Sequence, residues 1–204
     1  MLGAGAVGGY FGGRLVEAAA DVTFLVRPAR AAALKERGLL IESPAGDLHL
    51  PAQIATEDAL PGSFDTVLLT AKAYDLDQAI ATIRPAVGPA TVILPILNGL
   101  GHLDRLDAAF GQERILGGVA YISATLTAEG IIRHLNQVHG ISFGERSAGQ
   151  CPCRGNRRDV SCGEIRGPGE RQYPPRHVGK VRHDHLACRH ELSDAGFGWR
   201  NHRG

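Results

Sequence analysis

The chain begins Met1-Leu2-Gly3-Ala4-Gly5-Ala6-Val7-Gly8, and these eight residues decide the fold. They contain the spacing G-x-G-x-x-G, in which the first glycine permits a tight turn after a strand and the second lets the backbone approach a pyrophosphate. The third lets the following helix pack closely on the sheet, with unpaired N–H groups at its N-terminus facing the phosphates. The motif predicts that Gly3, Ala4, Gly5, Ala6, Val7 and Gly8 form a dinucleotide-binding loop.

The strand expected before this loop could include only Met1 and Leu2. In a doubly wound domain that strand lies in the centre of the sheet. Its truncation would leave two buried strand edges without ladder partners, at about 1–3 kcal/mol for each unpaired buried backbone group. A start codon assigned a few residues downstream of the true one would explain the short strand.

Residues 10 to 146 alternate between helical and strand patterns. Buried parallel strands are predicted from aliphatic and β-branched runs at Val22–Val26, Thr66–Thr70 and Thr91–Leu94. Helices are predicted at Tyr10–Ala20, Ala29–Arg37, Leu76–Val87 and Leu103–Phe110, and further strands at Leu39–Ile41, Leu48–Leu50, Gly117–Ser123, Gly130–Leu135 and Gly140–Phe143. This order predicts an α/β fold with a Rossmann-like, doubly wound and mainly parallel sheet whose first strand is truncated.

The residues after the second strand bear on which nucleotide binds. NAD sites usually place Asp or Glu there to bond the ribose 2′-hydroxyl, whereas this chain has Val26-Arg27-Pro28. A guanidinium pairs a 2′-phosphate that a carboxylate would repel. Arg27, with Arg30 near enough to help, therefore favours NADPH over NADH. The alternative is that Arg27 begins a solvated helix.

Two more polar residues follow predicted strands, at the sheet edge where open α/β folds bind ligands. Lys72 follows Thr66–Thr70 and could neutralise a phosphate or a carboxylate. Asn98 follows Thr91–Leu94 and could hold a nicotinamide-side or substrate group. Taken alone, each is better explained as an ordinary loop residue.

The last quarter of the chain has a different composition. Residues 151–204 carry eleven basic and six acidic side chains, all four cysteines and five of the nine histidines, but only seven Leu, Ile, Val, Phe or Met residues. So few aliphatic residues cannot bury enough surface to offset the entropy of ordering. We expect residues 1–146 to form a domain and residues 147–204 to be a disordered tail rich in Arg, Cys, His and Gly.

Five motifs occur along the chain: the segment Gly3–Gly12, the turn Val26-Arg27-Pro28, and the segments Thr70–Asp75, Leu97–Gly101 and Gly118–Ala124. Their order and spacing closely resemble the N-terminal domain of ketopantoate reductase (2-dehydropantoate 2-reductase). The resemblance covers about residues 1–146 and implies NADPH-dependent reduction of a 2-keto acid, ketopantoate to pantoate in pantothenate synthesis. It also implies that Gly3 to Gly8 hold the pyrophosphate, that Arg27 holds the 2′-phosphate, and that Lys72, Asn98 and Ala124 line the cofactor.

The chain departs from this family after Gln150. The family continues into a helical domain with a catalytic lysine that donates a proton to the nascent alkoxide, and no residue of this chain matches that lysine. Codons for His177–Val181 read one base later permit Met-Trp-Glu-Lys-Phe, which resembles the opening of the helical domain. A frame slip near Ser147–Cys153, as a mutation or a sequencing error, would explain the tail.

Two functions follow from these observations. The first is an NADPH-dependent 2-keto acid reductase, and the second is an NADP(H)-binding module without catalysis. The cysteines lack the spacing of zinc ligands, so no metal is expected. The scattered arginines carry no nucleic-acid-binding motif, and neither a signal peptide nor a membrane span is visible. We therefore expect a cytoplasmic protein whose partner is a small-molecule substrate.

Overall fold

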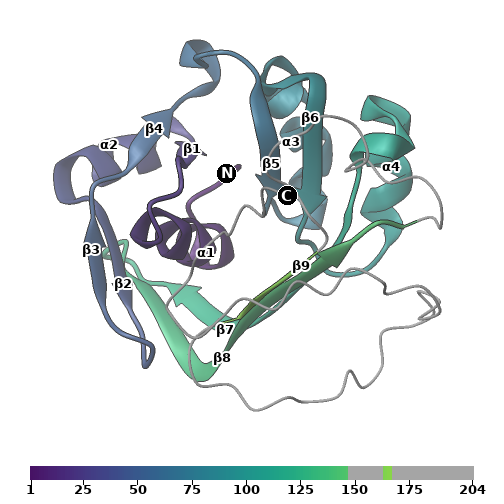
Figure 1. The fold of residues 1–204 in the computed structure, drawn as a ribbon. Coiled ribbons are helices and arrows are strands. Elements are labelled where there is room, and N and C mark those ends of the chain that lie inside the picture. The colour runs from purple at the N-terminus through teal and green to yellow at the C-terminus, as the bar shows by residue number, and fades with distance from the viewer. Residues whose placement is uncertain (147–162, 167–204) are drawn as a thin grey trace, which may run out of the picture.

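The computed structural model describes residues 1–146 and the short segment 163–166, which form α-helices and β-strands (Figure 1). The helices are α1 (Ala6–Glu17), α2 (Pro28–Arg37), α3 (Leu76–Ile83) and α4 (Gly101–Phe110). The strands are β1 (Thr23–Leu25), β2 (Leu39–Glu42), β3 (Leu48–Leu50), β4 (Gln53–Ala55), β5 (Phe64–Leu69), β6 (Val87–Pro95), β7 (Gly117–Leu126), β8 (Ile132–Gly144) and β9 (Gly163–Arg166). Short 3₁₀ turns lie at Glu57–Ala59, Ala73–Asp75, Arg84–Ala86 and Gln112–Arg114.

One layer of the fold is parallel. β1 pairs with β4, and β5 pairs with β6, both in parallel. Leu2 joins the two pairs because it bridges Leu25 of β1 and Leu69 of β5, again in parallel. The strand order across this layer is therefore β4, β1, Leu2, β5 and β6, which is the Rossmann-like arrangement predicted from the sequence.

The first strand is short in the structure, as predicted, and a groove continues from its start. The Met1 amino group donates a hydrogen bond of 2.9 Å to the Thr23 carbonyl, and burial lowers its pKa from 8.0 to about 6. A shallow hollow, open to solvent, lies between β1, β5 and the end of α3. It is lined by Met1, Leu2, Thr23, Leu25, Phe64, Thr66, Val67, Ile83 and Ala86. Its walls are thus mainly apolar.

A second, mixed sheet has the order β3, β2, β8 and β7, with β9 also on β8. The β2–β3 hairpin was predicted. The two strands predicted at Gly130–Leu135 and Gly140–Phe143 form the single strand β8, whose ladder with β7 shifts register between Ile122 and Ala124. β4 was not predicted. Gly163–Arg166 form a strand within the segment expected to be disordered. The rest of that segment, including the cysteines and the site of the frame slip, lies outside the described residues.

α1 packs between the two sheets (Figure 1). A Cβ added at Gly12 would come within 2.5 Å of the Phe24 ring of β1, and one at Gly13 within 2.5 Å of the Ile41 side chain of β2. Glycine at both positions therefore lets the helix approach each sheet closely. The same core contains the fully buried Tyr10 and Phe11 of α1.

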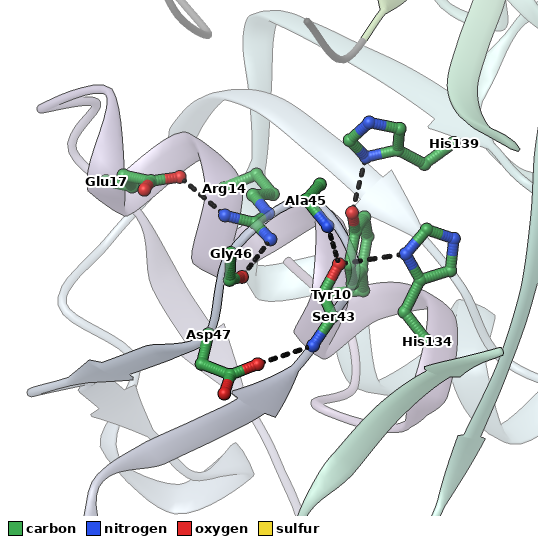
Figure 2. Close-up of polar contacts among 9 residues, drawn as sticks. All are labelled: Tyr10, Arg14, Glu17, Ser43, Ala45, Gly46, Asp47, His134 and His139. Atoms are coloured by element: carbon green, nitrogen blue, oxygen red, sulfur yellow. Dashed lines mark hydrogen bonds and ion pairs between the residues drawn. The ribbon is translucent and has the colours of Figure 1, made fainter. Parts of the chain in front are cut away.

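A buried polar cluster ties α1 to the second sheet (Figure 2). The Tyr10 hydroxyl contacts His139 Nδ1, and the guanidinium of Arg14 lies 5.3 Å from the centre of the Tyr10 ring. The Ser43 hydroxyl lies 2.9 Å from His134 Nδ1, and His134 Nε2 lies 3.2 Å from the Val138 carbonyl. Because that carbonyl can only accept, His134 Nε2 donates to it. The Tyr10–histidine cluster comprises Tyr10, Arg14, Ser43, His134 and His139.

Candidate functional site

The glycine loop leaves the parallel layer at its centre. The Leu2 amide donates to the Leu68 carbonyl at 2.8 Å, and the Gly3 amide donates to the Leu25 carbonyl at 2.9 Å. The Thr70 hydroxyl donates to the Leu2 carbonyl at 2.7 Å. Gly3 has a φ of +91°, a conformation that disfavours residues with a Cβ. The chain therefore turns out of the sheet between the carboxyl ends of β1 and β5.

Gly5 and Gly8 have opposite surroundings. A Cβ at Gly8 would collide with the Thr70 hydroxyl and would lie 2.5 Å from the Gly3 carbonyl, so Gly8 is needed for the helix to pack on the sheet. A Cβ at Gly5 would meet nothing within 4 Å, so the backbone there faces open space. This combination of a tight third glycine and an open second glycine fits a backbone that a pyrophosphate approaches.

The N-terminus of α1 is suited to an anion. All residues of α1 are described by the structure. Its N-cap residue, Gly5, provides no side-chain hydrogen bond, and its first turn contains no acidic residue. The first N–H groups of a helix lack partners within the helix, and the helix dipole adds partial positive charge there. The loop thus presents N–H donors and open space at one place, and the residues fit a dinucleotide pyrophosphate.

Arg27 lies where the sequence predicts a phosphate ligand. It follows β1 and is the N-cap residue of α2, and its side chain is 78 % exposed. Its guanidinium pairs with the Asp75 carboxylate at 3.2 Å. The side chain therefore reaches from the end of β1 to the segment that follows β5.

Arg30 lies close to the loop, but it contacts backbone carbonyls. Its Nε donates to the Ala4 carbonyl and its Nη1 to the Gly130 carbonyl, each at 3.1 Å. Burial lowers the pKa of Arg30, and the nearby Arg37 lowers it further. Arg30 therefore links the glycine loop to the turn between β7 and β8, which the sequence alone did not indicate.

Lys72 and Asn98 lie at the same edge, and Ala124 comes from the other sheet. Lys72 precedes the 3₁₀ turn after β5, and its ammonium lies 5.6 Å from the centre of the Tyr74 ring. Asn98 is exposed and lies three residues after the end of β6, before a Gly99 with φ +80°. Ala124 is half-buried on β7, opposite His134 of β8. The glycine loop, Arg27, Lys72 and Asn98 therefore all follow the carboxyl ends of strands of the parallel layer.

Sequence reasoning assigned no role to Asp75 or Thr70. Both lie inside a quoted motif, Thr70–Asp75, at the carboxyl end of a predicted strand, and that position was the available signal. The contacts they make, to Arg27 and to the Leu2 carbonyl, join residues 48 and 68 positions apart in the chain. Such long-range contacts depend on the strand order.

The layer order and the glycine loop define a Rossmann-like dinucleotide-binding fold. A family model described as ketopantoate reductase PanE/ApbA matches residues 1–148, and the chain belongs to this family. Among curated proteins, the chain is 43 % identical over 145 residues to an "uncharacterized oxidoreductase YkpB" of Bacillus subtilis, with 71 % of this chain and 48 % of that protein covered.

Two further proteins place the chain in the same family. It is 32 % identical over 150 residues to a 2-dehydropantoate 2-reductase of Nostoc sp., covering 73 % of this chain and 46 % of that protein. The crystal structure of 2-dehydropantoate 2-reductase from Geobacter metallireducens superposes with a TM-score of 0.65 at 37 % identity, covering 71 % of this chain and 48 % of that one. The chain thus spans about half the length of these relatives. Among the helices of the described residues, none has the length and apolar character needed to cross a membrane.

Proposed function

We propose that residues 1–146 bind NADPH and form the cofactor domain of a reductase that acts on a 2-keto acid, with 2-dehydropantoate as the first candidate. The observation that carries the proposal is the open Gly5 backbone at the uncapped N-terminus of α1, with Arg27 at the end of the neighbouring strand. Family membership supports the same chemistry. Bound NADPH would supply a hydride for reduction of the keto group.

The protein's own residues would bind and orient the cofactor. The glycine loop, Gly3 to Gly8, would hold the pyrophosphate at the N-terminus of α1, with Ala4, Ala6 and Val7 shaping the loop, and Arg27 would pair with the 2′-phosphate. Lys72 and Asn98 would lie along the cofactor at the parallel edge, with Asn98 toward the reacting end, and Ala124 would line it from β7. The assignments rest on the positions of these residues and on the family's motif pattern.

Replacing Arg27 by alanine is expected to weaken NADPH binding by about tenfold to a hundredfold and to leave NADH binding within about threefold. The reason is that a charge-assisted hydrogen bond contributes about 1.5–3 kcal/mol, and only NADPH carries the 2′-phosphate. Isothermal titration of the 204-residue chain with both cofactors measures the change. Equal losses for NADPH and NADH would contradict the role of Arg27.

Gly5→Ala and Gly8→Ala form a matched pair that separates binding from folding. Gly5→Ala is expected to reduce NADPH affinity by tenfold or more while changing the free energy of unfolding by less than about 1 kcal/mol, because its Cβ would enter only the open space. Gly8→Ala is expected to cost about 2 kcal/mol of stability, because its Cβ collides with backbone. Urea unfolding with NADPH titration measures both. Normal NADPH binding by Gly5→Ala would contradict the assignment of the loop.

A cofactor-binding module without catalysis is the second candidate. The observation that favours it is that the family match ends at residue 148 and covers about half of the relatives' length. Hydride transfer requires an oriented substrate shielded from water as well as a bound cofactor. A 2-dehydropantoate assay with NADPH distinguishes the two candidates: turnover supports the reductase, and NADPH binding without turnover supports the module.

A further inference from the structure

One ion pair crosses the mouth of the glycine loop. Arg27 follows β1, and Asp75 follows β5. Leu2 lies between these two strands, so the chain leaves the sheet at Gly3 between β1 and β5. The Arg27 guanidinium and the Asp75 carboxylate meet at 3.2 Å across this position. The cation proposed to hold the 2′-phosphate therefore already has an anion as its partner.

The two members of the pair differ in freedom of movement. Asp75 lies on a 3₁₀ turn in which its amide donates to the Lys72 carbonyl at 2.9 Å, and it immediately precedes α3, whose first residue, Leu76, is buried. Its side chain is 38 % exposed, compared with 78 % for Arg27. The carboxylate is thus held on a fixed backbone, and the long arginine side chain is the member that can turn to another anion.

Resting on the proposed NADPH site, we propose that Asp75 is a specificity-determining residue that competes with the 2′-phosphate for Arg27. NADH brings no phosphate to this position, so the Arg27–Asp75 pair can persist when NADH binds. NADPH brings a phosphate that has to displace the carboxylate or share the guanidinium with it. Asp75 thereby lowers the preference for NADPH below what Arg27 alone would give.

The size of this effect follows from the strength of the Arg27–Asp75 ion pair. A partly exposed ion pair contributes only modestly, and NADPH binding gives up that contribution when the phosphate takes the guanidinium from the carboxylate. This displacement weakens NADPH binding by roughly fivefold.

The test compares Asp75→Asn with Asp77→Asn. Both substitutions remove one negative charge near the start of α3, but Asp77 pairs with Arg105 and its side chain is 83 % exposed. In isothermal titrations of the 204-residue chain, Asp75→Asn is expected to lower the Kd for NADPH by about threefold to tenfold. The Kd for NADH, and both constants for Asp77→Asn, are expected to stay within twofold of wild type.

The same substitution in an Arg27→Ala background shows whether Asp75 acts through Arg27. The gain in NADPH affinity from Asp75→Asn is expected to fall below twofold there, because the competition has lost its target. An unchanged or raised Kd for NADPH in Asp75→Asn would overturn the inference, and so would an equal gain in NADPH affinity in Asp77→Asn. In either case, binding of NADPH by the wild-type chain would still support the proposed function. A wild-type chain that is folded by circular dichroism and binds neither cofactor would overturn both.

Discussion

Lowering the pH from 7 to 4 is expected to reduce the free energy of unfolding by about 3 kcal/mol through His139 alone. His139 is 1 % exposed, and burial, the neighbouring His134 and the Arg14 guanidinium lower its pKa from 6.5 to about 4. The unfolded chain binds a proton below pH 6.5, whereas the folded chain does so only near pH 4. The stability is therefore fully present above pH 6.5 and falls as the pH drops toward 4, by about 1.4 kcal/mol for each pH step.

The surroundings of His139 explain why protonation is costly. Tyr10 and Arg14 face it from α1, and His134 lies on the same strand (Figure 2). Arg14 is itself buried and pairs with Glu17 at 3.0 Å, so a second cation at His139 would add charge to a site that already holds one. The neutral imidazole instead shares a hydrogen bond with the Tyr10 hydroxyl through Nδ1.

The double variant Tyr10→Phe/His139→Leu removes both the titrating group and its partner. Its unfolding free energy, measured by urea denaturation at several pH values, is expected to lose about 3 kcal/mol less than wild type between pH 7 and pH 4. His49→Gln is the control, because His49 is exposed and its Nε2 lies 2.9 Å from the Arg37 carbonyl. A double variant with the wild-type pH dependence would assign the acid sensitivity to other groups.

Extending the chain at its N-terminus by Val-Ile-Val-Ile is expected to raise the free energy of unfolding by about 3 kcal/mol. The added residues would continue Leu2 into the groove between β1 and β5, whose walls include Leu25, Phe64 and Val67. Each buried aliphatic side chain contributes about 1.5–3 kcal/mol, and ordering its backbone costs about 1–2 kcal/mol. Backbone hydrogen bonds to β1 and β5 add to the gain in stability. In addition, the N-terminal amino group, whose protonation is disfavoured by burial at Met1, moves out of the sheet.

A Gly-Ser-Gly-Ser extension of the same length is the matched control. It moves the amino group in the same way but brings no apolar side chain, so it is expected to raise stability by less than about 1 kcal/mol. Urea unfolding of the three proteins at pH 7 gives the comparison. Equal stability of the two extended proteins would show that the groove does not accept a strand.

The sequence predicted the parallel layer because its signals are local. Aliphatic runs mark β1, β5 and β6, and the glycine spacing marks the start of α1. β4 was missed because its three residues, Gln53–Ala55, are too few to show a period. The pairing of the β2–β3 hairpin with the β7–β8 hairpin was also missed, because the backbone ladder that joins them is short and pairs Ile41 and Glu42 with Ile132 and Arg133. Pairings between such distant segments leave no local pattern.

The candidate site shows the same division. The glycine loop and Arg27 could be placed from motif and strand position, since both lie next to a predicted strand. The hydrogen bonds of Arg30 to the Ala4 and Gly130 carbonyls could not be predicted from the sequence, because they depend on where the turn between β7 and β8 packs. The Arg27–Asp75 pair likewise exists only because Leu2 brings β1 and β5 together.

The central claim is that the α1 N-terminus and Arg27 form an NADPH site, and isothermal titration of the wild-type 204-residue chain with NADPH and NADH in parallel tests it most directly. The expected result is a saturable complex with one NADPH per chain and a Kd at least tenfold lower than that for NADH, since only NADPH engages Arg27. A folded chain that binds neither cofactor, or that binds NADH more tightly, would contradict the claim.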